Sequence, residues 1–573
     1  MTVDPILETA IAAPELEPLL PQPAVQEAEA VGVGLARATT ILALGNIASR
    51  ILGFAKEILL SNYFGAGRLV DAFQIAITVP QDLYDLAISG HVNSAIVPVL
   101  SEYAVKDRHE LWRLVSALMG LVCIVTSLLV LILELFAPQV ITLYRGANPG
   151  IWAIDRSVHL LAPQIATLWP GKGISASAFD LSVHLLRLTA PALFFMSLFA
   201  VISGMLYALK RFTWPAFAAA LFNGTVVVTM VVLSPLVGIE RAAIGVVLGA
   251  VLQLVLQFGG LRGAHFHFQP ADVLRHPGVR RLGVLYIPVM VSLIMDVLIN
   301  RPFSYFMASQ AGDGNIAYMN WATSLREFPM GLVGTAISIA ILPTLARQAL
   351  NLTERQAFKD TLGQGIRLAL TLIIPATMGM FVLAGPLIGL VFERGAFTRA
   401  DTEAMSIVLR LYLFGIPFAA VDLLLIFAFY ALKDTVTPAV VGIFSLACYI
   451  VIAVVLQPGF GFRSLMIADS LKHLIHMTVC FVLIRRRLGD LGSQRLSITL
   501  FKAILATAVM SLVTYAMALS APLLWPVQGL PQRVLLVAVP SLLGGTTYLI
   551  LASLLRLNEF TWFMQALRRK IRN

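Results

Sequence analysis

The fold is decided by the sequence SRILGFAKEILLSNYFGAG at residues 49–67, which continues through RLVDAF at 68–73 to SAIVPVLSEY at 94–103. Most of this stretch is apolar enough to lie in a bilayer, yet it contains charge. The charged residues within or at the edges of its apolar segments are Arg50, Lys56, Glu57, Asp82 and Asp85. Charge inside a membrane is energetically expensive and usually serves a function. This stretch therefore contains the first candidates for a functional site.

The closing phrase of this stretch recurs in the second half of the chain. SAIVPVL at 94–100 is echoed by SIAILPTL at 338–345, and LYALKRFTWPA at 206–216 is echoed by FYALKDTVTPA at 429–439. Six predicted membrane spans separate the members of each pair. Because six is even, the two halves have the same orientation and are related by an axis along the membrane normal. The sequence therefore predicts two six-helix lobes around a cavity near the middle of the bilayer.

Composition indicates an all-α protein that crosses a membrane many times. Of the 573 residues, 58% are hydrophobic and 13% are charged, whereas soluble domains carry about 25% charged residues. No large soluble domain fits this composition. The formal net charge of +10 does not indicate a nucleic-acid partner, because the Lys and Arg residues gather in short loops between apolar segments, where they determine topology.

A membrane span needs about 20 predominantly apolar residues, and fourteen segments meet this criterion. Their approximate ranges are 38–62, 73–100, 112–143, 181–209, 214–237, 241–262, 283–309, 315–345, 365–392, 404–431, 437–457, 463–484, 498–520 and 533–556. An even number of spans places both termini on one side of the membrane. The loops rich in Lys and Arg identify that side as the cytoplasm.

The expected domain organisation follows from these ranges. Residues 1–36 lack the basic segment of a signal peptide and are expected to form a disordered cytoplasmic tail. The N-lobe, with helices 1 to 6, covers 37–265, and the C-lobe, with helices 7 to 12, covers 280–487. Two further helices occupy 496–557, and residues 558–573 form a basic cytoplasmic tail.

Several specific phrases carry a family resemblance. They are SRILGFAKE at 49–57, FGAG followed by DAF at 64–73, SAIVPVLSEY at 94–103, LREFPMGLVGTAISIAILPTLAR at 325–347, FERGAFTRADT at 392–402 and FYALKDTVTP at 429–438. Over residues 38 to 485 the chain resembles the MurJ (MviN) family of lipid II flippases, in the multidrug/oligosaccharidyl-lipid/polysaccharide exporter superfamily. The resemblance implies that an undecaprenyl-linked peptidoglycan precursor crosses the bacterial cytoplasmic membrane by alternating access of two lobes. It also implies a groove for the lipid tail in the last two helices. Expected partners are this substrate, membrane lipids and cell-wall synthesis proteins.

The resemblance extends to some of the family's cavity residues and departs at others. Arg50 matches a cavity arginine, and Lys56 stands where an arginine is usual. The second helix has Asp82 and Asp85 in the phrase where the family has an arginine pair. In the eighth helix Glu327 is kept while the family's arginine is lost. Arg326 is two positions from the lost arginine, about 200° around a helix, and so does not replace it.

Arg301 is a possible substitute for the missing positive charge. Asp296 and Asn300 precede it and share a helix face at i and i+4. Glu327 is a candidate for ion coupling, or for a switching salt bridge with Arg50 or Lys56. The predicted substrate-binding cavity residues are Arg50, Lys56, Arg301, Glu327, Asp82, Asp85, Asp296 and Asn300.

Polar residues on the twelfth helix have a local explanation. The i, i+4 spacing predicts pairs between Asp469 and His473 and between Lys472 and His476. Asp422 is a buried carboxylate candidate without an obvious partner in the sequence. Cys123, Cys448 and Cys480 lie inside apolar segments without CxxC spacing, which predicts small buried hydrophobic side chains. We expect no metal, no cofactor and no catalytic residue.

Other functions remain open at this point. A flippase for another polyprenyl-linked glycan and a cell-wall scaffold without transport activity are both compatible with the missing arginines. A small-molecule exporter of the same superfamily is favoured by Asp82 and Asp85 but disfavoured by Arg50, Lys56 and Arg301. A membrane enzyme acting on a polyprenyl lipid would need a clustered Asp, His or metal motif at one membrane face, and no such motif has convincing spacing.

Overall fold

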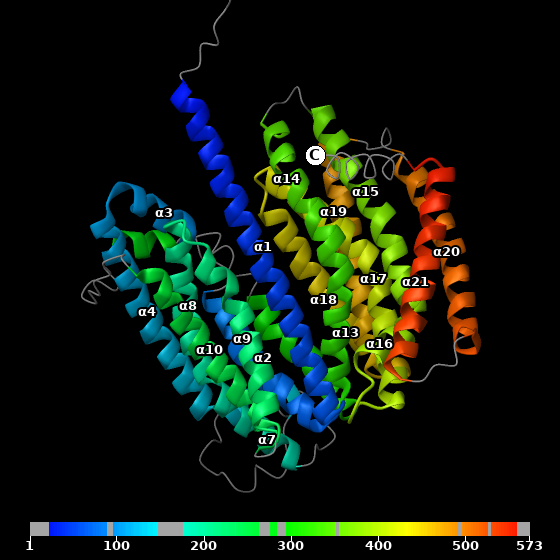
Figure 1. Cartoon of the computed structure of the whole chain (residues 1–573), viewed down its shortest axis with the longest axis horizontal. Coiled ribbons are helices and arrows are strands. Elements are labelled where there is room, and N and C mark those ends of the chain that lie inside the picture. Colours follow the sequence, from blue (N-terminus) through cyan, green and yellow to red (C-terminus); the bar gives the residue numbers. More distant parts are fainter. Residues whose placement is uncertain are drawn as a thin grey trace, which may run out of the picture.

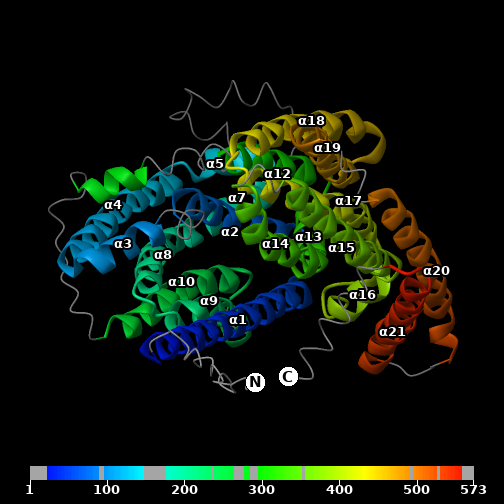
Figure 2. The same ribbon diagram turned by 90° about the horizontal axis from the view of Figure 1, so that it is seen from above.

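The computed structural model describes residues 22–88, 96–146, 176–234, 237–262, 276–283, 294–350, 355–489, 495–524 and 529–557. Within these ranges the chain is helical and contains no strand. The helices form two bundles side by side, with a further helix pair at one edge (Figures 1 and 2).

The first bundle corresponds to the predicted N-lobe. Its helices are α1 (Gln22–Phe64), α2 (Arg68–Ala87), α3 (Val97–Lys106), α4 (Arg108–Leu135), α5 (Ala137–Arg145), α7 (Ala176–Thr189), α8 (Pro191–Ala208), α9 (Thr213–Val232) and α10 (Glu240–Leu261). Long α1 packs on α9, and α10 packs on α8 and α9. The short segment 276–283 also belongs here, because Arg281 Nη1 lies 2.7 Å from Glu102 Oε2 of α3.

The second bundle corresponds to the predicted C-lobe. It begins with a π-helical turn, η5 (Asp296–Asn300), and continues through α12 (Arg301–Gln310), α13 (Asn315–Pro329), a second π-helical turn η6 (Met330–Thr335), α14 (Ala336–Gln348), α15 (Arg355–Val382), α16 (Ala384–Val391), α17 (Arg399–Ala431), α18 (Val436–Phe460) and α19 (Arg463–Leu488). The final pair, α20 (Leu496–Leu524) and α21 (Leu530–Leu554), lies beside α15 and α16 at the edge of this lobe (Figure 2).

Eleven helices in the described part of the chain are long and apolar enough to cross a membrane, which confirms a protein with many spans. The predicted count of fourteen is not confirmed. The three predicted ranges that fall outside the eleven are 38–62, 73–100 and 283–309. The ranges 73–100 and 283–309 extend over residues outside the described part of the chain, at 89–95 and 284–293, and the range 38–62 contains Arg50, Lys56 and Glu57, whose charge lowers mean hydropathy.

Of the two predicted cytoplasmic tails, the structure describes only residues 22–36. Helix α1 already begins at Gln22, so the second half of the expected disordered tail, residues 22–36, is helical. This expectation was wrong because the segment is rich in Ala and Glu, which favour helix, and has Pro23 in the first turn, where proline is tolerated. Residues 1–21 and 558–573 lie outside the described residues.

The repeat seen in the sequence produces the same local structure in both lobes. Lys210 and Lys433 have positive φ angles, 58° and 59°, at the ends of α8 and α17. In each lobe the next residue's N–H bonds to the carbonyl five residues back, Arg211 to Leu206 at 2.8 Å and Asp434 to Phe429 at 2.9 Å. This is the Schellman helix end. The two echoed phrases therefore stop equivalent helices in the same way.

The loop after α17 also positions the next helix. Burial raises the pKa of Asp434, but hydrogen bonds from the Thr437 N–H and hydroxyl and from Arg487 outweigh burial and hold the pKa below its usual value. Because the bonds favour the carboxylate, their contribution to stability is present above the unfolded pKa, about 3.9, and is lost as the pH falls through the lowered folded pKa.

The FERGAFTRADT phrase forms a turn between α16 and α17. Thr398 and Asp401 make a reciprocal capping box at the start of α17. The Tyr318 hydroxyl donates to Asp401 at 2.5 Å, which ties the turn to α13.

Candidate functional site: the contact between the lobes

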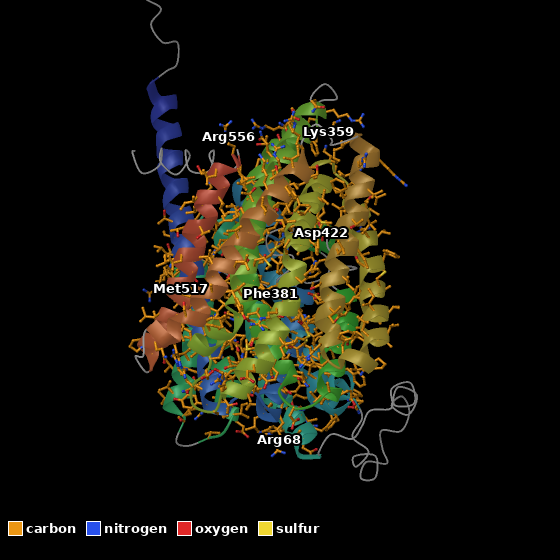
Figure 3. The ribbon with its side chains drawn as sticks, turned by 90° about the vertical axis from the view of Figure 1, so that its right-hand side faces the viewer. Arg68, Lys359, Phe381, Asp422, Met517 and Arg556 are labelled. Carbon is orange, nitrogen blue, oxygen red and sulfur yellow. The ribbon has the colours of Figure 1, made fainter. Side chains whose placement is uncertain are left out.

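Figure 3 places Arg68 at one end of the molecule and Lys359 and Arg556 at the other. We call these the outer and inner ends, after the expected topology. Helix α2 starts at the outer end and carries polar residues at spacings of 3, 4 and 4, which share one helix face. They are Asp71, Gln74, Thr78 and Asp82, all at least nine-tenths buried. We call this set the α2 stripe; it faces the C-lobe.

Asp71 of the stripe caps a helix of the opposite lobe. Its carboxylate accepts hydrogen bonds from the backbone N–H groups of Gly314, at 2.7 Å, and Ala317, at 2.9 Å. Helix α13 has no side-chain cap of its own, so Asp71 satisfies two of its otherwise unpaired N–H groups and lies at the positive end of its dipole. The two lobes are thereby joined at the outer end.

Two glycines allow the backbones to approach at this end. Gly314 has φ +87°, and a Cβ there would lie 2.8 Å from the Ala66 carbonyl oxygen. Gly395 has φ +56° and touches Asn62, whose carbonyl accepts from the Ala396 N–H at 2.8 Å. A side chain at either position would push the lobes apart.

Glu57 of α1 makes a further contact between the lobes. Its Oε2 accepts from the Trp321 indole at 2.8 Å and from Gln74 at 3.5 Å, while its Oε1 lies 3.0 Å from the Lys56 ammonium. Lys56, a predicted cavity cation, is therefore neutralised by its neighbour and is largely buried.

Arg301 is paired with two of the predicted carboxylates. Its guanidinium lies 3.5 Å from Asp82 in the N-lobe and 3.6 Å from Asp296, and Asn300 donates to Asp296 at 2.7 Å. The sequence placed Asp296 and Asn300 on one helix face, and here they are hydrogen-bonded, while a substrate-binding role for these residues stays a prediction. Thr78 of the α2 stripe makes a further contact between the lobes, because its hydroxyl lies 3.0 Å from the Tyr305 hydroxyl. In this conformation Arg301 ties the lobes together.

Arg50 and Glu327 differ from these paired residues. Both are exposed. In the part of the chain that the structure describes, Arg50 forms neither an ion pair nor a hydrogen bond, and its guanidinium lies near Gly331. Glu327 forms no ion pair with Arg50 or Lys56 among the described residues, so the predicted switching bridge is not made here. Asp85 is half-buried.

The arrangement has a direction. From Asp71 to Asp82 the α2 stripe spans eleven residues, about 16 Å of helix, so the polar contacts hold the lobes together over about the outer three-quarters of α2. Arg50 is seven residues from Glu57 toward the inner end of α1, about 10 Å. Arg50 and Asp82 are each fourteen residues, about 21 Å, from the outer ends of their helices, so Arg50 is level with the inner end of the closed contact, and no described residue pairs with it.

A second charged cluster lies inside the C-lobe. Arg326 forms an ion pair with Asp469, stacks over Tyr412 at 4.4 Å and points away from the cavity residues, as helix geometry predicted. Lys472 is 2.7 Å from Asp469 and His473 is 3.9 Å from it. The predicted Lys472–His476 pair was wrong, because His476 bonds instead to Asp422 on α17 at 2.5 Å. Partners on different helices leave no spacing signal in the sequence.

Replacing Arg326 with alanine should destabilise the chain by about 3 kcal/mol, at the lower end for breaking a buried ion pair, because Lys472 still neutralises Asp469. The measurement is the midpoint of thermal denaturation in detergent. Arg399→Ala is the matched control, since that side chain is 86% exposed and its ion pair with Glu403 is on the surface, where pairs contribute little. An equal fall of the denaturation midpoint in both variants would show that the buried ion pair contributes no more stability than the surface pair.

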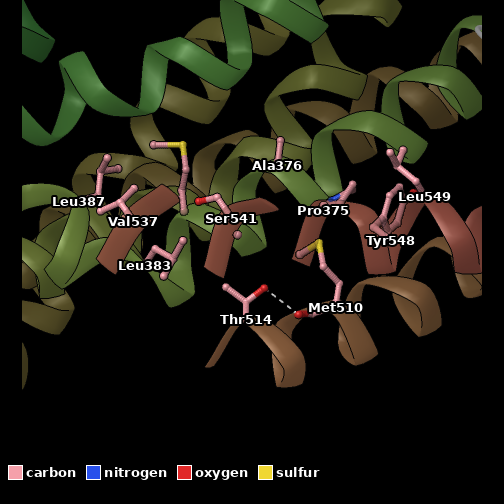
Figure 4. Close-up of a pocket in the computed structure, with 13 residues that line it drawn as sticks. Pro375, Ala376, Leu383, Leu387, Met510, Thr514, Val537, Ser541, Tyr548 and Leu549 are labelled. Carbon is pink, nitrogen blue, oxygen red and sulfur yellow. Dashed lines mark hydrogen bonds between the residues drawn. The ribbon is translucent and has the colours of Figure 1, made fainter. Parts of the chain in front are cut away.

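An apolar cavity separates the final helix pair from the C-lobe (Figure 4). Its volume is about 380 Å³. It is lined by Pro375, Ala376, Gly379, Met380, Leu383, Leu387, Met510, Thr514, Val537, Ser541, Gly545, Tyr548 and Leu549. Tyr548 is anchored by its bond to the Thr371 carbonyl at 2.5 Å. The mostly apolar lining suits a hydrocarbon chain.

Comparisons with known proteins agree on one family. The family described as "Lipid II flippase MurJ" matches residues 60–535. A "Probable lipid II flippase MurJ" of Vibrio cholerae is 30% identical over 452 residues, covering 78% of this chain and 82% of the relative. A "Lipid II flippase MurJ" of Burkholderia cenocepacia is 28% identical over 467 residues, covering 79% and 84%.

Solved structures share the fold. "Lipid II flippase MurJ, inward closed conformation" has a TM-score of 0.71 at 21% identity and covers 90% of this chain and 98% of that chain. An inward-facing multidrug resistance MATE family transporter has a TM-score of 0.60 at 13% identity, with 80% and 99% coverage. The architecture of two lobes is therefore that of known transporters.

Proposed function

The chain belongs to the MurJ family of lipid II flippases, and from this we propose that it moves lipid II, the undecaprenyl-linked peptidoglycan precursor, across the bacterial cytoplasmic membrane. Lipid II carries a pyrophosphate, a bulky polar head and a long lipid tail. A flippase holds the head in a hydrated cationic cavity while the tail stays in lipid. No bond is made or broken, so the chain acts as a transporter rather than as an enzyme, with both termini in the cytoplasm.

The observation that carries this proposal is the Arg50 guanidinium at the inner end of the closed lobe contact, which no described residue pairs with. A guanidinium offers paired donors that match phosphate oxygens, and nothing among the described residues competes for them. In the proposed cycle, the pyrophosphate binds Arg50 from the cytoplasmic side; the carboxylates of Glu327 and Asp85, which would repel it, take no part in this contact. Opening of the α2 stripe then exposes the head to the outer side.

The remaining predicted cavity residues have a gating role in this proposal. Arg301 is neutralised by Asp82 and Asp296, and Lys56 by Glu57, while the contacts are closed. When the lobes separate at the outer end, Arg301 loses Asp82 and keeps Asp296, while Lys56 stays paired with Glu57 on its own helix. Positive charge then becomes available as the head passes, and Asn300 holds Asp296 in place.

The experiment is complementation of bacteria depleted of their own lipid II flippase. Expression of the chain should restore growth and outer-leaflet lipid II, and Arg50→Ala or Arg301→Ala should reduce both. Absence of rescue by a correctly inserted chain would reject lipid II as the substrate and favour another polyprenyl-linked glycan or a scaffold role beside cell-wall synthesis proteins.

The apolar cavity is proposed to hold part of the lipid tail. Gly545 lines the cavity, and a Cβ there would meet no atom within 4 Å, so Gly545→Phe should place its ring in space that the tail would otherwise occupy. We expect it to reduce rescue roughly tenfold, because about 1.4 kcal/mol of tail binding corresponds to that factor. Gly459→Phe is the control, at an exposed and equally open position on α18. Equal rescue by both variants would contradict a tail site here.

A further inference from the structure

Three side chains of different chemistry meet inside the C-lobe, away from the lobe contact. Asp422 comes from α17, while His476 and Cys480 are one turn apart on α19. Their oxygen, nitrogen and sulfur ligand atoms all lie within 4.8 Å of one another. Relative exposures are 6%, 8% and 0%. Figure 3 places Asp422 within the bundle, toward the end that carries Lys359.

We propose that Asp422, His476 and Cys480 form a binding site for a divalent transition metal ion of the zinc type. Zinc in proteins is bound by imidazole nitrogen, thiolate sulfur and carboxylate oxygen, and three protein ligands leave a fourth position open. The His476–Cys480 spacing of four places two ligands on one helix face, and Asp422 supplies the third from the helix packed against it. The predicted absence of metal rested on spacing within the sequence, which does not detect a ligand 54 residues away.

The distances support this assignment. Metal bonds of about 2.0 to 2.3 Å place neighbouring tetrahedral ligand atoms about 3.3 to 3.8 Å apart. His476 Nδ1 lies 3.7 Å from Cys480 Sγ and 2.5 Å from Asp422 Oδ1. The first distance already fits. The second is a hydrogen bond, which has to widen by about 0.8 Å to admit an ion.

The second nitrogen of the imidazole is already oriented as in a metal site. His476 Nε2 lies 3.3 Å from the Pro438 carbonyl oxygen of α18. Histidines that bind metal through one nitrogen commonly donate the other N–H to a carbonyl or carboxylate, which fixes the tautomer and the ring. Here that bond leaves Nδ1 facing Asp422 and Cys480.

Charge balance suits a buried site. A dipositive ion with one carboxylate, one thiolate and one neutral imidazole has no net charge, which limits the cost of burial in a medium of low dielectric. Lys472, one turn from His476, is occupied by Asp469 at 2.7 Å and does not fill the site. Binding releases the Cys480 proton and the proton shared between His476 and Asp422, so affinity rises with pH.

The experiment uses the full-length chain, free of tags and metals, in detergent, titrated with Co²⁺ as a spectroscopic probe. We expect a saturable near-ultraviolet charge-transfer band of one thiolate bound to one Co²⁺, displaced by Zn²⁺. Cys480→Ser should abolish the band, and His476→Gln and Asp422→Asn should weaken binding at least tenfold. Cys448→Ser, at a half-buried cysteine on α18, is the matched control and should keep the band.

A second measurement does not depend on the variants folding. Zn²⁺ should raise the thermal denaturation midpoint of the wild-type chain, since a ligand that binds the folded state stabilises it, and a chelator should reverse the shift. Absence of a saturable Co²⁺ band in wild type, or a band that survives Cys480→Ser, would overturn the proposal and leave an Asp–His hydrogen bond without metal.

Discussion

Replacing Arg50 with alanine will remove the rescue of flippase-depleted cells almost completely. Arg50 is the predicted cavity cation that no described residue neutralises, so its charge is fully available to a phosphate. A hydrogen bond to a charged group contributes about 1.5 to 3 kcal/mol, and loss of a two-point contact should lower transport by a factor of 100 or more. The measurement is outer-leaflet lipid II at matched expression.

The conservative variant and a surface variant make this result specific. Arg50→Lys keeps the charge but loses the paired donors, so we expect transport between those of wild type and Arg50→Ala. Arg399→Ala removes an arginine whose side chain is 86% exposed at the start of α17 and should transport normally. If Arg50→Ala transports as well as Arg399→Ala, the guanidinium does not contact the substrate.

Much of the fold could be predicted from the sequence because the patterns that specify it are local. Apolar segments of span length predicted the helices, and the echoed LYALK and FYALK phrases predicted the relation between the lobes. Both phrases end in a lysine with positive φ, a backbone geometry that depends on residues within one turn. The exception at residues 22–36 arose because Ala and Glu are common both in disordered tails and in helices.

The site was only partly predictable. Charge in an apolar segment identified Arg50, Asp82, Asp296 and Arg301, and the structure brings the last three together. Asp71 was missed because its carboxylate accepts hydrogen bonds from backbone N–H groups. Such partners cannot be recognised from the pattern of side chains in the sequence.

The same limit applies to the partners of single charged side chains. Glu57 was recognised as a charge, but its contact with Trp321 joins residues 264 positions apart. Contacts between lobes are a property of the assembled bundles, so residue spacing within one helix could not reveal them.

Asp71→Asn will shift the protein toward opening at its outer end. The substitution keeps the shape of the side chain but removes the charge that accepts from Gly314 and Ala317 and that favours the N-terminus of α13. One of the two N–H groups then faces an amide NH₂ instead of an acceptor. A loss of about 1.5 to 3 kcal/mol corresponds to a 10- to 150-fold change in the ratio of closed to open states.

Spin labels on the two lobes measure this ratio directly. Labels at Arg68 and Arg399 report the outer end, and labels at Lys106 and Arg486 report the inner end; all four positions are exposed. Cys123 and Cys448 are replaced by serine, and buried Cys480 is retained.

Asp71→Asn should lengthen the outer distances and shorten the inner ones, because separation of the lobes at one end brings them together at the other. Asp180→Asn, an exposed outer-end carboxylate on α7, should change neither. Unchanged distances in Asp71→Asn would mean that the cap does not hold the lobes, and the gate would then have to rest on Arg301 and Glu57.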